Sequence, residues 1–186
     1  MSDVRVFADE SCLGNGREGS NPGGAGGLIE HVHPTTGKVT LFDYWLSEPA
    51  TTNNRMALRS AIEALQILSR KGKRVSVEFT SDSQYLVKGM REWVVGWKAR
   101  GWRRREGAIE NLALWQQLDE AAKAHLVKWQ WVRGHAGHPQ NEYANHLATR
   151  AAREQSNSGG PVPSLYGEWL AAEQSRGRLV AIPDNR

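Results

Sequence analysis

The stretch "VRVFADESCLGNG" at residues 4–16 decides the architecture of the chain. Its first part, residues 4–8, is rich in β-branched and aromatic residues and predicts a strand. The strand ends in two acidic residues, Asp9 and Glu10, and a glycine-rich loop follows. Neighbouring residues of a strand point to opposite faces, so the two carboxylates are not an obvious pair for one site. The stretch therefore raises the question of what Glu10 does.

The segments downstream predict that strands and helices share one mixed sheet. Residues 28–49 predict two strands around a turn near Gly37, whereas the glycine-rich residues 16–27 are expected to form a loop. A helix with an apolar face follows, capped by Asn53 or Asn54. Further strands are expected at residues 75–82 and 126–132, and helices at residues 109–125 and 140–155, with short helices broken near Gly89 and Gly101 between residues 82 and 102. Strands that follow helices imply parallel crossovers joined to an antiparallel meander, so the predicted fold class is α/β.

Length and composition limit the class of protein. The 186 residues are 39% hydrophobic and include eight tryptophans, which suits one folded domain and not a disordered chain. No apolar run is long enough to span a bilayer, and the polar N-terminus lacks a signal-peptide pattern. The single cysteine, Cys12, has no cysteine partner for a disulfide or a metal site. We therefore expect a cytoplasmic, monomeric protein without a membrane partner.

Positive charge is concentrated in one segment of the chain. The net charge of the whole chain is only +4, but residues 88–105 hold seven basic residues and one acid. The basic residues are Lys88, Arg91, Lys98, Arg100, Arg103, Arg104 and Arg105. A local positive field attracts polyanions, so this segment predicts a polyanion-binding surface.

Acidic residues end two of the predicted strands. Asp9 ends the first strand and Asp82 ends the strand that follows the first helix. If these strands are neighbours in the sheet, the two carboxylates could bind a divalent metal at their carboxyl ends. Aspartate is also common in the turns that follow strands, and these two residues alone favour that simpler interpretation.

Five further stretches, taken together and in this order, resemble the type 1 ribonuclease H family of bacteria. They are "SCLGN" at 11–15, "TTNNRM" at 51–56, "TSDSQY" at 80–85, "WVVGWKARGW" at 93–102 and "WVRGHAGHPQNE" at 131–142. The resemblance implies a ribonuclease H domain at residues 1–153. Residues 154–186 read as a linker-like tail from which "LYGEWLAAE", residues 165–173, could dock as a short helix.

The resemblance implies both a fold and an activity. It implies a five-stranded mixed sheet in the order 3-2-1-4-5 with helices on both faces. It also implies cleavage of the RNA strand of RNA–DNA hybrids, dependent on Mg²⁺ or Mn²⁺, leaving 5′-phosphate and 3′-hydroxyl ends. In the typical member an Asp–Asp–Glu–Asp quartet holds two ions that clamp the attacking and leaving oxygens.

Only two positions of that quartet keep their charge in this chain. The two strand-end acids match Asp9 and Asp82, but the helix glutamate is Ala57 and the last aspartate is Asn145. The residue after the first aspartate, usually glycine in the family, is Glu10. The type 2 ribonuclease H family carries an adjacent Asp–Glu pair as metal ligands, so our hypothesis is that Glu10 replaces the missing helix glutamate. The expected metal and catalytic set is Asp9, Glu10, Asp82 and Asn145.

Two other interpretations remain open at this stage. In the first, Glu10 is a solvated loop residue and the chain is a catalytically inactive hybrid-binding protein. In the second, the tail docks on a protein partner. Hybrid cleavage in Mg²⁺ or Mn²⁺ separates the active enzyme from the inactive hybrid-binding protein.

The resemblance also implies roles for residues outside the quartet. His135 matches the active-site histidine, which is implied to move a proton to the leaving group or to assist product release. The residues matching hybrid-binding positions are Cys12, Asn15, Thr52, Asn53, Asn54, Gln84, Trp93, Lys98, Arg100, Arg103, Arg104 and Arg105. Trp93 is expected to pack on a deoxyribose, and Trp97 and Trp102 to form a small core within the basic segment. Trp115, Trp129 and Trp131 are predicted to pack in the core or on a sheet face.

Overall fold

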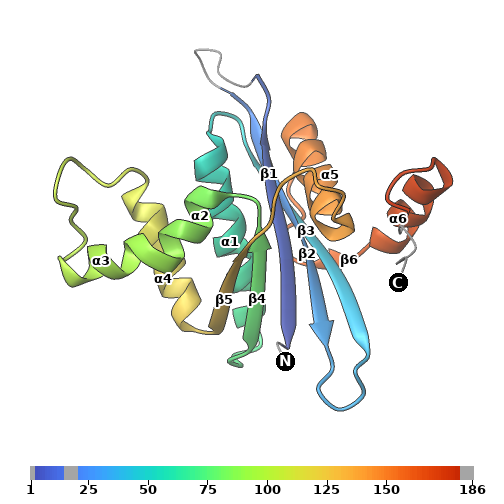
Figure 1. The fold of residues 1–186 in the computed structure, drawn as a ribbon, viewed down its shortest axis with the longest axis horizontal. Coiled ribbons are helices and arrows are strands. Elements are labelled where there is room, and N and C mark those ends of the chain that lie inside the picture. Colours follow the sequence, from blue (N-terminus) through green and yellow to red (C-terminus); the bar gives the residue numbers. More distant parts are fainter. Residues whose placement is uncertain (1–2, 15–20, 181–186) are drawn as a thin grey trace, which may run out of the picture.

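The computed structural model describes residues 3–14 and 21–180, which form one mixed sheet with helices on both faces (Figure 1). The strands are β1 (Val4–Cys12), β2 (Gly23–Val32), β3 (Val39–Glu48), β4 (Ser76–Ser81), β5 (Leu126–Trp131) and β6 (Val162–Pro163). The helices are α1 (Asn53–Ser69), α2 (Gln84–Lys88), the π-helical turn η1 (Gly89–Trp93), α3 (Val94–Ala99), α4 (Leu112–Lys123), α5 (Pro139–Glu154) and α6 (Tyr166–Ser175). Within the described residues, no helix has the length and apolarity needed to cross a membrane.

The sheet has six strands in the order β5-β4-β1-β2-β3-β6. β1, β2 and β3 form an antiparallel meander, and β4 and β5 lie parallel to β1. The predicted order of five strands is therefore confirmed, but the predicted number of strands is wrong. The sixth strand comes from the tail, where Val162 and Pro163 pair with Asp43 and Phe42 at the outer edge of the sheet. Proline is tolerated there because the edge position does not require its missing N–H.

The glycine-rich segment is not a loop over its whole length. Gly23 to Gly27 belong to β2, and β1 continues to Cys12 because it pairs with them. A Cβ on Gly24 would lie 2.4 Å from the backbone oxygen of Ala148 in α5. The glycines therefore allow α5 to lie directly on the strand, which sequence reasoning mistook for a loop signal.

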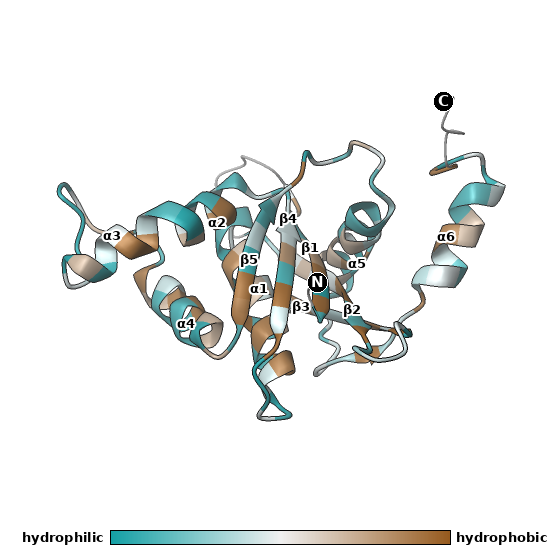
Figure 2. Cartoon of the chain, turned by 60° about the horizontal axis from the view of Figure 1, so that its bottom comes forward, coloured by the Kyte–Doolittle hydropathy of each residue, from teal (hydrophilic) through white to brown (hydrophobic). Residues whose placement is uncertain are grey.

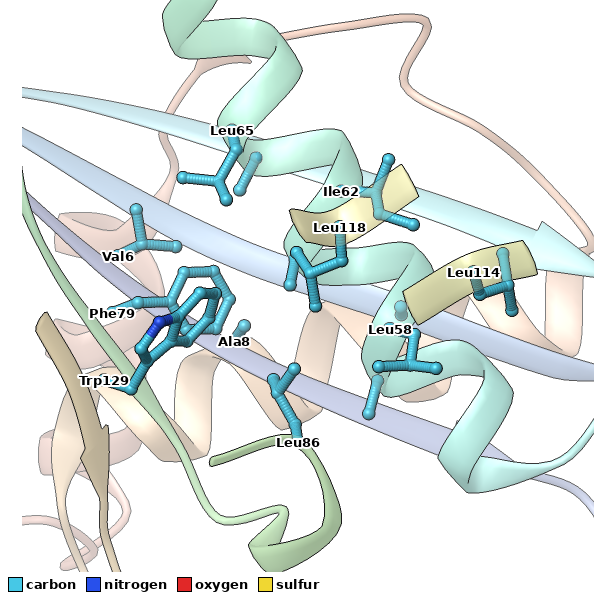
Figure 3. Packing of buried hydrophobic residues seen from close by; sticks show 14 of the residues in the cluster. Val6, Ala8, Leu58, Ile62, Leu65, Phe79, Leu86, Leu114, Leu118 and Trp129 are labelled. Atoms are coloured by element: carbon cyan, nitrogen blue, oxygen red, sulfur yellow. The ribbon is translucent and has the colours of Figure 1, made fainter. Parts of the chain in front are cut away.

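The two faces of the sheet carry different cores. The larger core packs β1, β4 and β5 against α1, α2 and α4, and it includes Val6, Ala8 and the buried Trp115. Figure 3 shows Phe79 and Trp129 lying side by side, with Leu58, Ile62 and Leu65 placed along α1 in the same cluster. Figure 2 shows the hydrophobic stretches that β4 and β5 contribute. The smaller core lies under α5 and contains Phe7, Leu28, Tyr143 and Leu147.

The start of α1 and the course of α2 differ in detail from expectation. The N-cap of α1 is Thr52, not Asn53 or Asn54, because the Thr52 side chain accepts a hydrogen bond from the Arg55 amide at 3.2 Å. No helix break occurs at Gly89, where the π-helical turn joins α2 to α3. A Cβ at Gly89 would lie 2.0 Å from the Trp115 indole, so this glycine serves close packing.

Candidate metal centre and active site

Three carboxylates meet at the carboxyl ends of β1 and β4. The two strands are adjacent and parallel (Figure 1). Asp9 and Glu10 lie near the end of β1, and Asp82 follows directly after β4. One carboxylate oxygen from each residue lies within 4.8 Å of the other two. Strand adjacency therefore brings together three of the four predicted ligands.

The consecutive residues Asp9 and Glu10 approach the site from opposite faces of the sheet. Asp9 is paired with Gly26, the glycine that faces α5, and the Asn145 side chain of α5 lies near enough to Asp9 to lower its pKa. Glu10 has the same strand parity as Val6 and Ala8, which pack under α1. The two side chains therefore converge at the strand end, one from each side. The structure thus places all four predicted ligands in one region.

Ala57 lies on the same side of the sheet as Glu10. It is buried on the inner face of α1, in the cluster that contains Val6 and Ala8. A longer acidic side chain is absent at that position, and an acid on β1 is present instead. The arrangement fits the hypothesis that Glu10 takes the place of a helix glutamate.

Burial raises the pKa values of all three acids, and repulsion from the neighbouring acids adds to the rise at Asp9 and Glu10. Burial, followed by the charge of Asp82, raises the pKa of Asp9 to about 7. Burial, followed by the charges of Asp9 and Asp82, raises the pKa of Glu10 well above its usual range. Burial also raises the pKa of Asp82, although the adjacent Asp9 carboxyl and the nearby His135 act in the opposite direction. The Asp9 Oδ2 atom is buried without a hydrogen-bond partner.

These features fit a divalent cation. A cluster of repelling carboxylates with a buried, unpartnered oxygen is stabilised when a cation neutralises it. The donors are all oxygens, which suits hard ions such as Mg²⁺ and Mn²⁺ and not soft thiolate-binding metals.

The pKa of Asp9 predicts how the stability of the metal-free protein depends on pH. A carboxyl whose folded pKa lies above its unfolded pKa binds its proton more tightly in the folded state, so stability falls as pH rises through the interval from about 4 to about 7. A difference of one between the folded and unfolded pKa changes the free energy of unfolding by about 1.4 kcal/mol. We expect the melting temperature in a chelator to fall between about pH 4 and about pH 7, and added Mg²⁺ to raise it more at the higher pH. Asp9→Asn should flatten this dependence; an equally steep profile in that variant would contradict the assignment.

The loop after β5 brings His135 to the edge of the site. His135 adopts a positive φ of 52°, and its side chain is 71% exposed. Its Nδ1 atom lies 3.7 Å from the Glu142 carboxylate, and both groups influence the pKa of Asp82. Sequence reasoning missed Glu142. The available signal was its place in the first turn of α5, three residues before Asn145.

Trp131 does not pack in the core, which was one of the two places predicted for it. Trp131 is 44% exposed, and its Nε1 donates a hydrogen bond to the backbone oxygen of Asp82 at 3.0 Å. Trp131 ends the outermost strand on that side, so its neighbours leave the ring uncovered. By contrast, Trp115 and Trp129 are buried, as predicted.

Gly134 leaves room for the Asp82 carboxylate, which yields a test of the site. A Cβ at Gly134 would lie 2.3 Å from Asp82 Oδ2. We expect Gly134→Ala to displace that carboxylate and to raise the half-saturating Mg²⁺ concentration for activity about tenfold, with little change in melting temperature. Gly167→Ala is the matched control, because a Cβ there meets nothing within 4 Å. An unchanged Mg²⁺ requirement in Gly134→Ala would show that Asp82 need not hold its present position.

The predicted hybrid-binding residues near the acids lie at the same end of the sheet. Thr52, Asn53 and Asn54 start α1, Gln84 starts α2, and Cys12 ends β1. Thr52, Asn53 and Gln84 are exposed, while Cys12 and Asn54 are half-buried. Asn15 lies outside the described residues.

The basic segment forms a protrusion around an aromatic cluster. The ring of Trp93 lies 5.7 Å from Tyr85, 6.0 Å from Trp97 and 6.2 Å from Trp115, measured between ring centroids. Trp97 and Trp102 pack against the main core, not in a separate small core within the basic segment as predicted. A cavity of about 500 Å³ opens beside Trp93. It is lined by Tyr85, Glu92, Trp93, Gly96, Trp97, Arg100, Arg104 and Glu110.

The basic side chains of the protrusion are not equally available. Lys98 Nζ lies 3.0 Å from the Asp119 carboxylate, so part of its charge is neutralised. Arg100, Arg103, Arg104 and Arg105 are exposed. Arg103, Arg104 and Arg105 therefore carry the positive charges of the predicted hybrid-binding set that are most available to a ligand.

Comparison with known proteins identifies the family. The RNase H family model matches residues 1–153. A ribonuclease HI of Pseudomonas putida is 46% identical over 156 residues, which is 83% of this chain and 97% of that protein. The crystal structure of LC9-RNase H1, a type 1 RNase H with the type 2 active-site motif, superimposes with a TM-score of 0.89 at 57% identity, over 100% of this chain and 90% of that chain.

A more distant structure shares the fold. LC11-RNase H1, solved in complex with an RNA/DNA hybrid, has a TM-score of 0.57 at 17% identity and covers 82% of this chain and 98% of that chain. The resemblance to type 1 ribonuclease H inferred from the motifs is confirmed by the family model and the closer relatives. The chain therefore belongs to the ribonuclease H family of endoribonucleases.

Proposed function

We propose that this protein hydrolyses the RNA strand of RNA–DNA hybrids at a site built from Asp9, Glu10, Asp82 and Asn145. The observation that carries the proposal is the convergence of three carboxylate oxygens within 4.8 Å of one another at the strand ends. The names of the relatives support the reaction class, and the hybrid bound to LC11-RNase H1 supports the substrate class.

Glu10 is proposed as the replacement for the missing helix glutamate. The adjacent Asp9 and Glu10 correspond to the acidic pair of type 2 enzymes, while Ala57 removes the acid of type 1 enzymes. LC9-RNase H1, at 57% identity, combines a type 1 protein with the type 2 motif, which supports the same assignment here. The inactive hybrid-binding alternative rests on the loss of charge at Ala57 and Asn145, and the presence of Glu10 in the cluster weighs against it.

Two Mg²⁺ or Mn²⁺ ions are the proposed cofactors, and when bound they supply an activated water and neutralise charge on the phosphodiester. Asp9, Glu10 and Asp82 provide the negative charge that holds them. Asn145 lies beside Asp9 and offers a neutral oxygen of similar reach. The proposed products carry 5′-phosphate and 3′-hydroxyl ends.

His135 is proposed to serve the leaving group from outside the carboxylate cluster. Its ring lies on an exposed loop, beside Glu142 and close enough to Asp82 to influence the pKa of that residue. From this position an imidazole can donate a proton to the departing oxygen or help the product leave.

Hybrid binding is proposed to extend from the site to the protrusion. The amides at the starts of α1 and α2 can contact groove edges and sugars without selecting a base sequence. Trp93 and the arginines of the protrusion are proposed to hold the DNA strand through sugar packing and phosphate contacts. The substrate therefore spans two separate surfaces of the protein.

A cleavage assay on the full chain tests the proposal. A hybrid labelled on the RNA strand is incubated with Mg²⁺, with Mn²⁺ or with a chelator, alongside single-stranded RNA and double-stranded DNA. We expect cleavage of the RNA strand of the hybrid in the presence of either metal, and fragments that a 5′-phosphate-dependent exonuclease degrades. Binding of the hybrid without cleavage in both metals would favour the inactive hybrid-binding protein instead.

A further inference from the structure

The C-terminal tail is fastened to both β3 and α5. Ser158 donates its amide to the Trp45 carbonyl at 2.9 Å, and its hydroxyl accepts from the Trp45 amide at 3.0 Å. Beyond it, β6 pairs with β3, and α6 follows (Figure 1). The tail therefore closes the outer edge of the sheet and continues over α5.

A buried carboxylate connects the tail to α5. Asp43 of β3 is 2% exposed, and its Oδ2 accepts a hydrogen bond from Tyr143 of α5 at 2.6 Å. The tail supplies two more donors, the Ser164 hydroxyl at 2.6 Å and the Leu165 amide at 3.1 Å. A buried carboxylate is stabilised only when such donors surround it, so Asp43 holds strand, helix and tail together.

Aromatic packing adds a second connection to the same helix. The ring of Trp169 in α6 lies 5.1 Å from Tyr143 and 5.9 Å from His146, measured between centroids. The ring of Tyr166 lies 5.3 Å from Tyr143. Tyr143 lies two residues before Asn145 and His146 one residue after it. The tail therefore contacts α5 close to the last predicted ligand.

The loss of charge at Asn145 makes the position of α5 more important. An aspartate would be drawn toward a bound cation by its full charge, whereas a neutral amide oxygen is attracted far more weakly. Its placement must therefore come from the scaffold that holds the helix. The Asn145 side chain lies beside Asp9, and the tail contacts the helix that carries it.

We propose that Asp43, Tyr143, Ser164 and Trp169, here called the tail latch, act as positioning residues that keep the Asn145 oxygen in the metal site. The proposal rests on the proposed function. It assigns to the tail a role in metal affinity and not only in stability.

A double variant of the full chain, Ser164→Ala with Trp169→Ala, tests the tail latch. Mn²⁺ affinity is measured by calorimetry without substrate, and backbone hydrogen exchange is followed along α5. We expect the Mn²⁺ dissociation constant to rise about tenfold, as for the loss of groups that orient a ligand. Backbone hydrogen exchange in α5 should become faster. Adding Asn145→Asp to the double variant should restore most of the affinity, because a charged ligand depends less on the scaffold.

Ile67→Val serves as the stability control, because Ile67 packs on the α1 side of the sheet, away from α5. We expect it to lower the melting temperature without changing Mn²⁺ affinity. If the double variant loses stability but keeps the parental affinity, the inference is overturned and the tail only stabilises the fold. If Asn145→Asp fails to restore a lost affinity, the positioning role is likewise overturned. If the parental chain itself binds no Mn²⁺, the proposed function fails first.

Discussion

Replacing Glu10 by glutamine is expected to lower the rate of hybrid cleavage in Mg²⁺ by more than about 100-fold, beyond the loss expected for a residue that only orients a ligand. Glutamine keeps the shape of the side chain and removes only its charge. The charge matters because Asp9 and Asp82 would otherwise face the ions as the only carboxylates of the identified cluster. The melting temperature of the metal-free variant should stay level or rise, since Glu10 and its neighbours repel one another. Cleavage near the parental rate would refute the replacement.

Two companion variants separate the role of Glu10 from general effects of charge. Glu78→Gln is the matched control, because Glu78 lies on β4 outside the cluster and pairs loosely with Lys128 at 3.9 Å. It should cleave at the parental rate. The double variant Glu10→Gly with Ala57→Glu returns the acid to α1, and it should recover much of the activity that Glu10→Gly loses. Failure of this rescue would mean that the surroundings of Ala57 no longer admit an acid.

The central part of the site could be predicted from sequence because strand ends fix it. Asp9 lies near the end of one buried strand and Asp82 follows another, and the mixed order of strands and helices makes those strands parallel neighbours. The place of Asn145 follows from the apolar face of α5, which directs the helix onto β1 and β2. The sequence alone did not show how Asp9 and Glu10, on opposite faces of a strand, contribute to one site.

Other features depend on contacts between segments far apart in the chain. Gly24 and Gly26 lie in a glycine-rich segment whose composition is typical of a turn. They nevertheless belong to β2, where α5 packs closely against them. The short strand β6 has almost no local strand signal and exists because β3 offers it an open edge. The exposure of Trp131 follows from its place on the outermost strand, which the local alternation of residues did not reveal.

The second large effect is expected at the protrusion, where Arg103, Arg104 and Arg105 are changed together to alanine. All three are exposed, and within the described part of the chain none forms an ion pair, so their charges are free to contact phosphates. If each contacts one phosphate, the slope of log affinity against log salt should become shallower by about 0.9 per residue lost. Affinity for the hybrid at low salt should fall by roughly 100-fold.

The matched control removes the same charge elsewhere. Lys71, Lys73 and Arg74 lie exposed between α1 and β4, at the opposite end of the sheet from the acids (Figure 1). Their replacement by alanine should leave the salt slope almost unchanged, although the net charge falls equally. The rate at saturating hybrid should persist in both triple variants, because neither set touches the carboxylate cluster. An unchanged slope in the Arg103–Arg105 variant, or an equal change in the control, would show that the protrusion attracts the hybrid only through net charge and does not bind its phosphates.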